Sequence, residues 1–96
     1  MLSMLEIAII NGPNLNLLGK REPDVYGHAS FEEFLAQLKK DFPTVQFTYF
    51  QSNIEGEIVE AIQAHGFNKA GIILNPAAYT HTSVAIGDAV AAIKTP

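Results

Sequence analysis

An arginine and a tyrosine lie close together in a polar stretch that follows the first apolar segment of the chain. Arg21 and Tyr26 fall within residues 15–27, where glycine and proline interrupt any regular pattern and predict a long loop. A tyrosine hydroxyl, with an ordinary pKa of about 10, becomes a usable base only where a fixed cation favours the phenolate. Arginine suits that task because it keeps its own proton. The pair indicates a loop that could abstract a proton from a bound molecule.

Amide and hydroxyl side chains gather after two apolar runs. The first group follows residues 5–10 and comprises Asn11, Asn14 and Asn16. The second follows residues 70–74 and comprises Asn75, Tyr79, Thr80, His81, Thr82 and Ser83. With one arginine and one histidine, these groups suit a hydroxylated, uncharged or carboxylate-bearing small molecule, and the sequence holds no nucleotide motif. Taken singly, an asparagine at a strand end is more often a turn former than a ligand.

Three segments have the patterns of β-strands, which would position these groups. Residues 5–10 and 70–74 are continuously apolar and predict strands buried on both faces. Residues 45–49 alternate apolar and polar side chains, which predicts a less deeply buried strand at the sheet edge.

Helices are predicted between these strands. Two capping boxes, beginning at Ser30 and Ser52, predict helices over 31–41 and 54–65. The first helix would bury an apolar face made of Phe31, Phe34, Leu35 and Leu38. We expect Gly66 to end the second helix in the left-handed conformation that glycine adopts readily.

A third helix follows the last strand, with Thr82 or Ser83 as its cap. Its apolar face would comprise Ile86, Ala89, Val90 and Ile93. The β-α-β-α-β-α order predicts one domain over 1–96, built on a parallel sheet with right-handed crossovers. In the flavodoxin strand order 2-1-3, ligands bind beyond the carboxyl ends of strands 1 and 3. The two polar groups would then flank one crevice.

The composition narrows the classes of partner. The net charge is −4, and the 6 Lys and Arg residues are scattered, so we expect neither nucleic acid nor an anionic membrane as a partner. The sequence has no Cys, and its 3 His residues stand at no ligand spacing, so we expect no metal. The N-terminus has no pattern of a signal peptide or membrane span.

Several motifs in order resemble type II 3-dehydroquinate dehydratase. They are NGPNLNLLG at 11–19, REP at 21–23 with YG at 26–27, FQSN at 50–53 with EGE at 55–57, and NPAAYTHTSVA at 75–85. The resemblance runs over nearly the whole chain. It implies an α/β fold, a flavodoxin-like parallel sheet with helices on both faces, of which this chain would cover about three strands and three helices.

The resemblance also implies a reaction. Enzymes of that family remove water from 3-dehydroquinate to give 3-dehydroshikimate, without a cofactor, through an enolate formed next to the ketone. By motif position, Tyr26 resembles the base and Arg21 the residue that holds it as phenolate. Asn14 matches an asparagine that positions a water near the developing enolate oxygen. Asn75 and His81 match substrate-binding positions.

Assembly and localisation follow from the same resemblance. Asp88 matches an aspartate that approaches a neighbouring subunit's site in dodecamers built from trimers, and we expect a cytoplasmic homo-oligomer. The chain departs from the family at Gly87, where an arginine is usual. The family also continues past the position of Pro96 with a strand, the histidine that protonates the leaving hydroxyl, and a further arginine. We therefore expect a chain truncated at its C-terminal end.

The sequence suggests two other interpretations. The first is a catalytically incomplete fragment that acts as a binding or assembly module, separated from the enzyme by whether residues follow Pro96. The second is a phospho-acceptor receiver domain, which needs acidic residues where the strands over 5–10 and 70–74 end. Asn11 and Asn75 stand there, which disfavours the receiver domain.

Overall fold

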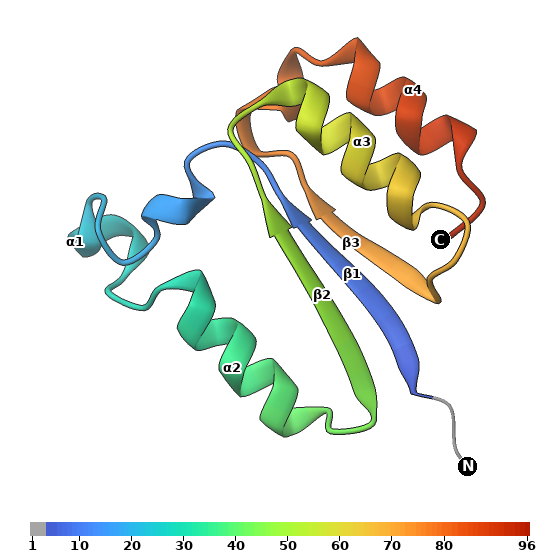
Figure 1. The fold of residues 1–96 in the computed structure, drawn as a ribbon. Helices are drawn as coiled ribbons and strands as arrows, with labels where there is room; N and C mark the ends of the chain where they lie inside the picture. The colour runs from blue at the N-terminus through green and yellow to red at the C-terminus, as the bar shows by residue number, and fades with distance from the viewer. Residues whose placement is uncertain (1–3) are drawn as a thin grey trace.

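Three parallel strands form one sheet at the centre of the molecule (Figure 1). The computed structural model describes residues 4–96, apart from the side chain of Tyr26. The strands are β1 (Leu5–Asn11), β2 (Val45–Gln51) and β3 (Gly71–Asn75), in the order β2-β1-β3. This is the predicted 2-1-3 order, in which the central strand β1 pairs in parallel with β2 on one side and with β3 on the other.

Helices cover both faces of this sheet, as the flavodoxin-like α/β prediction requires. α3 (Glu55–His65) and α4 (Val84–Ala92) lie together on one face, and α2 (Phe31–Asp41) lies on the other (Figure 1). The loop predicted over 15–27 contains a short 3-10 helix, Leu15–Leu17, and the short helix α1 (Pro23–Tyr26). Another 3-10 helix, Ala77–His81, precedes α4.

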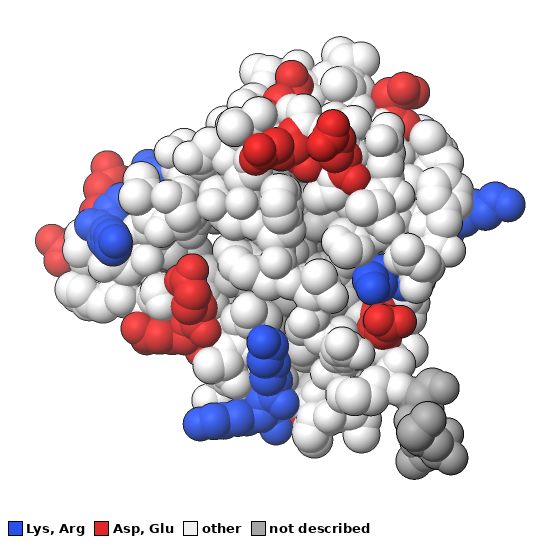
Figure 2. Space-filling view, viewed as in Figure 1, with Lys and Arg blue, Asp and Glu red and all other residues white. Residues whose placement is uncertain are grey.

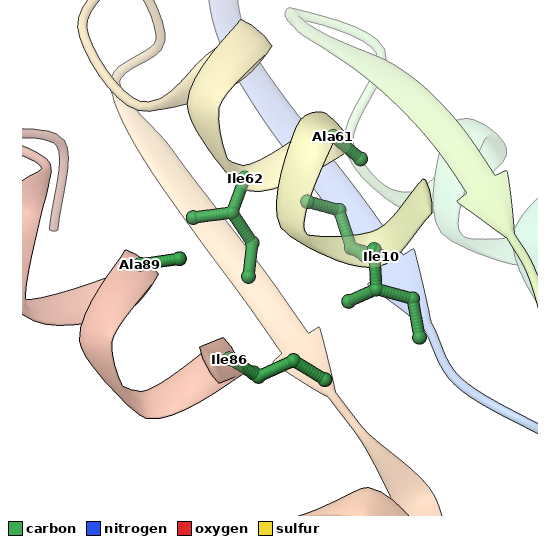
Figure 3. Packing of buried hydrophobic residues seen from close by; sticks show 6 residues of the cluster. Ile10, Ala61, Ile62, Ile86 and Ala89 are labelled. Atoms are coloured by element: carbon green, nitrogen blue, oxygen red, sulfur yellow. The ribbon is translucent and has the colours of Figure 1, made fainter. Parts of the chain in front are cut away.

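The hydrophobic core lies between the sheet and the α3–α4 pair. Figure 3 shows Ile10 from β1, Ile62 from α3 and Ile86 from α4 directed toward one another. Ile10, Ile58 and Ile62 are completely buried. Ala61 and Ala89 complete the cluster, and Figure 3 shows the small side chain of Ala89 directed from α4 toward Ile62 of α3. This core packs α3 and α4 against β1, the central strand of the sheet.

The opposite face is covered less completely. The ring of Phe31 in α2 stacks on Tyr49 of β2, with ring centroids 4.8 Å apart. Burial raises the pKa of Tyr49, a hydrogen bond with Asn11 lowers it, and the charge of Glu32 raises it further. The predicted burial of Phe34 is wrong, because this residue is 54% exposed.

The predicted helix caps are right at two positions and wrong at a third. The Ser30 hydroxyl accepts from the Glu33 amide at 3.2 Å, and Ser83, not Thr82, caps α4 by accepting from the Ile86 amide at 3.0 Å. At α3 the N-cap is Ile54, so the second capping box is incorrect. The Ser52 hydroxyl instead accepts from the Ile54 amide at 2.9 Å.

Gly66 ends α3 as predicted, but it does not adopt the predicted left-handed conformation. Its φ of −76° and ψ of −4° are right-handed helical values. A Cβ at this position would lie 2.1 Å from Cγ2 of Ile93, so glycine is required by a close approach. The Gly66 carbonyl also accepts from the amides of Lys94 and Thr95 at 3.0 and 2.8 Å, which holds the end of the chain against α3.

Burial of the third strand is less than its apolar run predicts. β3 lies at an edge of the described sheet, and Ile73 is 55% exposed. Along its outer side the Pro96 carbonyl accepts from the Ile72 amide at 2.7 Å. A continuous apolar run therefore marked a strand correctly but not its depth in the sheet.

The surface carries both signs of charge. On the face shown in Figure 2, Lys and Arg occur at separate places, with Asp and Glu between them. Within residues 4–96, no helix is long and apolar enough to cross a membrane.

Candidate functional site

The three strands end at the same row of the sheet, which forms the base of the candidate site. Asn11 pairs in register with Gln51 on one side and with Asn75 on the other. The Gly12 amide donates to the Asn75 carbonyl at 2.8 Å. A Cβ on Gly12 would lie 2.5 Å from the Pro76 carbonyl oxygen, so only glycine permits this approach. The two polar loops therefore start from one packed platform.

Asn14 leaves this platform in an uncommon backbone conformation. Its φ of 69° is left-handed, a region that asparagine tolerates better than most residues. Its amide donates to Oδ1 of Asn53 at 2.9 Å, and its carbonyl accepts from the Leu17 amide at 3.0 Å. The turn sets Asn14 at the mouth of a cavity.

That cavity brings Asn14 and Arg21 together. Its volume is 170 Å³, and its lining residues come from the loop after β1 and the loop after β3: Pro13, Asn14, Leu15, Leu18, Arg21, Ala77 and Ala78. Nη2 of Arg21 lies 3.9 Å from Oε2 of Glu22, and both side chains are substantially exposed. An exposed pair at this distance contributes little to stability. Arg21 thus lines the cavity as its cationic residue.

The structure describes only the backbone of Tyr26, the residue that the sequence predicts to be the base. Tyr26 is the last residue of α1 by its backbone, and its side chain falls outside the described part of the chain. Its pairing with Arg21 stays a prediction from the sequence. Glu22 precedes α1 in a left-handed conformation, with φ of 38°, which sets the direction of that helix.

Asn75 and His81 lie on the loop after β3, but in different surroundings. Oδ1 of Asn75 accepts from the Ala77 amide at 3.0 Å, while Ala77 has a positive φ of 53°. Asn75 therefore shapes the turn, and its side-chain NH₂ group can still serve as a donor. His81 is exposed and lines a neighbouring hollow of 210 Å³ together with Thr80, Thr82, Ser83 and Val84.

Asp88 is separate from both of these hollows. It is an exposed residue of α4 and is absent from the lining of each. The neighbouring Gly87 has no atom within 4 Å of the position that a Cβ would take. A larger side chain at Gly87 would therefore fit on this surface without a clash.

The arrangement can bind and polarise a small polar molecule. Arg21 supplies a cation, Asn14 supplies an amide, and Leu15 and Leu18 supply apolar contact. These groups suit a carboxylate or a developing negative oxygen. At 170 Å³ the cavity is smaller than the roughly 300–1,000 Å³ of most ligand sites. A substrate of ordinary size would extend past these walls.

Sequence reasoning assigned no role to the residues that join the loops. Gln51 and Asn53 contact the loop after β1, and the Tyr79 hydroxyl donates to the Asn53 carbonyl at 2.9 Å. The FQSN motif at 50–53 was a signal for these residues, but nothing in it indicated which groups they contact.

The fold and the site place this chain among open parallel α/β domains that bind ligands at the carboxyl ends of their strands. A family model described as "Dehydroquinase class II" matches residues 5–96, so the chain belongs to the class II dehydroquinase family.

Curated relatives in this family are named 3-dehydroquinate dehydratase. One from Exiguobacterium sp. is 50% identical over 93 residues, which cover 96% of this chain and 63% of the relative. Another, from Legionella pneumophila (strain Corby), is 47% identical over 96 residues, covering 97% of this chain and 66% of the relative. The chain thus spans less than two thirds of the length of these relatives.

Solved structures in the same family have the same fold. A type II dehydroquinase from Butyrivibrio crossotus has a TM-score of 0.81 and 43% identity, covering 96% of this chain and 68% of that one. A 3-dehydroquinate dehydratase-like protein from Bifidobacterium longum has a TM-score of 0.59 and 31% identity, covering 90% and 60%. The flavodoxin-like arrangement is therefore shared with solved members of the family.

Proposed function

We propose that this protein takes part in the reversible dehydration of 3-dehydroquinate to 3-dehydroshikimate, a step of the shikimate pathway toward chorismate and the aromatic amino acids. The observation that carries this proposal is the match of residues 5–96 to the dehydroquinase family, combined with the cavity that Asn14 and Arg21 share. The activity would be that of a hydro-lyase that uses no cofactor.

In the proposed mechanism, Tyr26 as phenolate takes a proton from the carbon next to the ketone. Arg21 favours that phenolate, because a fixed cation lowers the free energy of the charged form. The electrons left on carbon form an enolate, and a water held by Asn14 donates a hydrogen bond to its oxygen. The hydroxyl group then leaves as water, after protonation by an acid that the resemblance assigns to the sequence after position 96.

Asn75 and His81 would bind the substrate from the loop after β3. Asn75 would act as a donor through its side-chain NH₂ group, because its Oδ1 already accepts from the Ala77 amide. His81 is exposed beside three hydroxyl-bearing residues, which suits a polyhydroxylated ligand. The substrate would span both hollows.

We further propose a cytoplasmic homo-oligomer, a dodecamer built from trimers, in which Asp88 reaches the site of a neighbouring subunit. The exposure of Asp88 on α4 is compatible with that role. Open space at Gly87 means that the usual arginine would be accommodated there, so its absence removes a contact, and glycine within α4 also weakens the helix.

A second candidate is a binding or assembly module without turnover. It is favoured by the small volume of the cavity, 170 Å³. Such a module would bind the substrate weakly through Arg21 and the loop after β3.

The experiment is a direct assay with 3-dehydroquinate, following the absorbance of the conjugated enone product. Residues 1–96 are assayed alone. An extended protein is assayed in parallel, in which residues 1–96 are followed by the C-terminal segment of the Exiguobacterium relative that lies beyond the matched region. Turnover in the extended protein supports the enzyme. Binding without turnover in both supports the module, and neither binding nor turnover in both refutes the proposed function.

A further inference from the structure

A hydrogen-bonded cluster joins the loop after β2 to the loop that carries Asn14. Oδ1 of Asn53 accepts from the Asn14 amide at 2.9 Å and from Nε2 of Gln51 at 3.2 Å. The same Nε2 donates to the Gly12 carbonyl at 3.0 Å and lies 3.4 Å from Oδ1 of Asn16. These side chains therefore contact the loop after β1 at three successive places.

The cluster is itself attached to the end of the sheet and to the loop after β3. Gln51 is the last residue of β2 and pairs in register with Asn11, so its side chain starts from the rigid end of the sheet. The Tyr79 hydroxyl donates to the Asn53 carbonyl at 2.9 Å, which adds a connection to the loop after β3. All three site loops meet at Asn53.

The hydrogen bond from the Asn14 amide to Asn53 helps to hold Asn14 in its left-handed conformation. Asn14 is left-handed, and outside glycine this conformation persists only where its surroundings hold it. The Asn53 contact fixes the amide of Asn14, and with it the direction in which its side chain enters the cavity beside Arg21.

We propose that Gln51 and Asn53 are positioning residues for the dehydration, holding Asn14 in the geometry in which its side chain positions the water that donates to the developing enolate. The effect on the dehydration rests on the proposed function. The claim that Gln51 and Asn53 hold Asn14 in place does not. Neither residue touches the reacting atoms in this scheme; each acts through Asn14.

The chemistry of the two side chains gives opposite expectations for two isosteric changes. Asn53 serves the cluster as an acceptor through Oδ1, so Asn53→Asp keeps both contacts. Gln51 serves as a donor through Nε2, so Gln51→Glu sets a carboxylate oxygen against the oxygens of Gly12, Asn16 and Asn53. A role in general packing would treat the two changes alike.

The test measures hydrogen exchange of the Asn14 backbone amide by NMR in the protein of residues 1–96. We expect about fivefold faster exchange in Asn53→Ala, the equivalent of one ordinary hydrogen bond, and a similar change in Gln51→Glu. Asn53→Asp should restore most of the protection that Asn53→Ala loses. Unchanged exchange in Asn53→Ala, or equal loss in Asn53→Asp and Asn53→Ala, would overturn the proposal. If Asn53→Ala does not fold, the comparison of Asn53→Asp with Gln51→Glu decides alone.

The same variants are then assayed for turnover in the extended protein. We expect Gln51→Glu and Asn53→Ala to lower kcat by about tenfold or more with little change in KM, because misplacement of a positioned group acts on the transition state. A change confined to KM would overturn the positioning role. If the unsubstituted protein shows no turnover, the proposed function has failed, and the exchange data still decide whether Gln51 and Asn53 hold Asn14.

Discussion

Replacing Gly12 by alanine tests the platform on which the two site loops stand. The added Cβ would lie 2.5 Å from the carbonyl oxygen of Pro76 and 2.7 Å from its carbonyl carbon. Both atoms belong to the backbone, and the hydrogen bond from the Gly12 amide to Asn75 holds the two strand ends together. The clash therefore cannot be relieved by rotating a side chain.

The size of the effect follows from two opposing contributions. Forcing a methyl group into a packed site costs about 1–3 kcal/mol. Gly12 does not have a positive φ, so alanine also restricts the unfolded chain and returns about 0.4–1 kcal/mol. We expect a net loss of stability of roughly 1–2 kcal/mol.

The assay is urea unfolding of the variant, with Gly87→Ala as the matched control. Gly87 lies in α4 with no atom within 4 Å of its Cβ position, so the same substitution should stabilise the protein by about 1 kcal/mol. The two variants should therefore shift the unfolding midpoint in opposite directions. Equal shifts, or a Gly12→Ala protein as stable as the parent, would refute the claim of a backbone contact between the loops.

Three further substitutions test separate parts of the fold. Ser83→Ala should cost about 1 kcal/mol in thermal unfolding, whereas Thr82→Ala should cost little, because only Ser83 caps α4. Ile62→Ala should cost about 2–5 kcal/mol by urea unfolding, and a loss under 1 kcal/mol would contradict its burial. Burial, and secondly the charge of Lys69, lowers the pKa of His65. Its contribution to stability is therefore present above pH of about 6.5 and lost as the pH falls below it, and unfolding of His65→Gln at several pH values should lack this loss.

Much of the fold could be predicted from local patterns. The apolar runs and the capping box at Ser30 predicted the right elements in the right order, because each is a pattern that can be recognised within one short segment. The depth of β3 and the reason for Gly66 could not be predicted. Both depend on what lies beside them in space, because β3 is at an edge of the described sheet and Gly66 lies against Ile93, and local patterns carry no such information.

The location of the candidate site could be predicted from the sequence, but most of the contacts within it could not. Parallel topology brings the loops after β1 and β3 to one edge, so the meeting of Asn14 with Ala77 and Ala78 followed from strand order. The separation of His81 into a neighbouring hollow and the role of Asn53 depend on loop geometry. Left-handed residues such as Asn14 set that geometry, and their conformation is not encoded in apolar periodicity.

The most direct test of the central claim is the initial rate of enone formation from 3-dehydroquinate, measured in the extended protein with and without Tyr26→Phe. The account predicts turnover in the parent and its loss in the variant, with substrate binding largely retained, because phenylalanine keeps the ring and removes only the hydroxyl that takes the proton. Near-normal turnover in Tyr26→Phe would contradict the proposed mechanism.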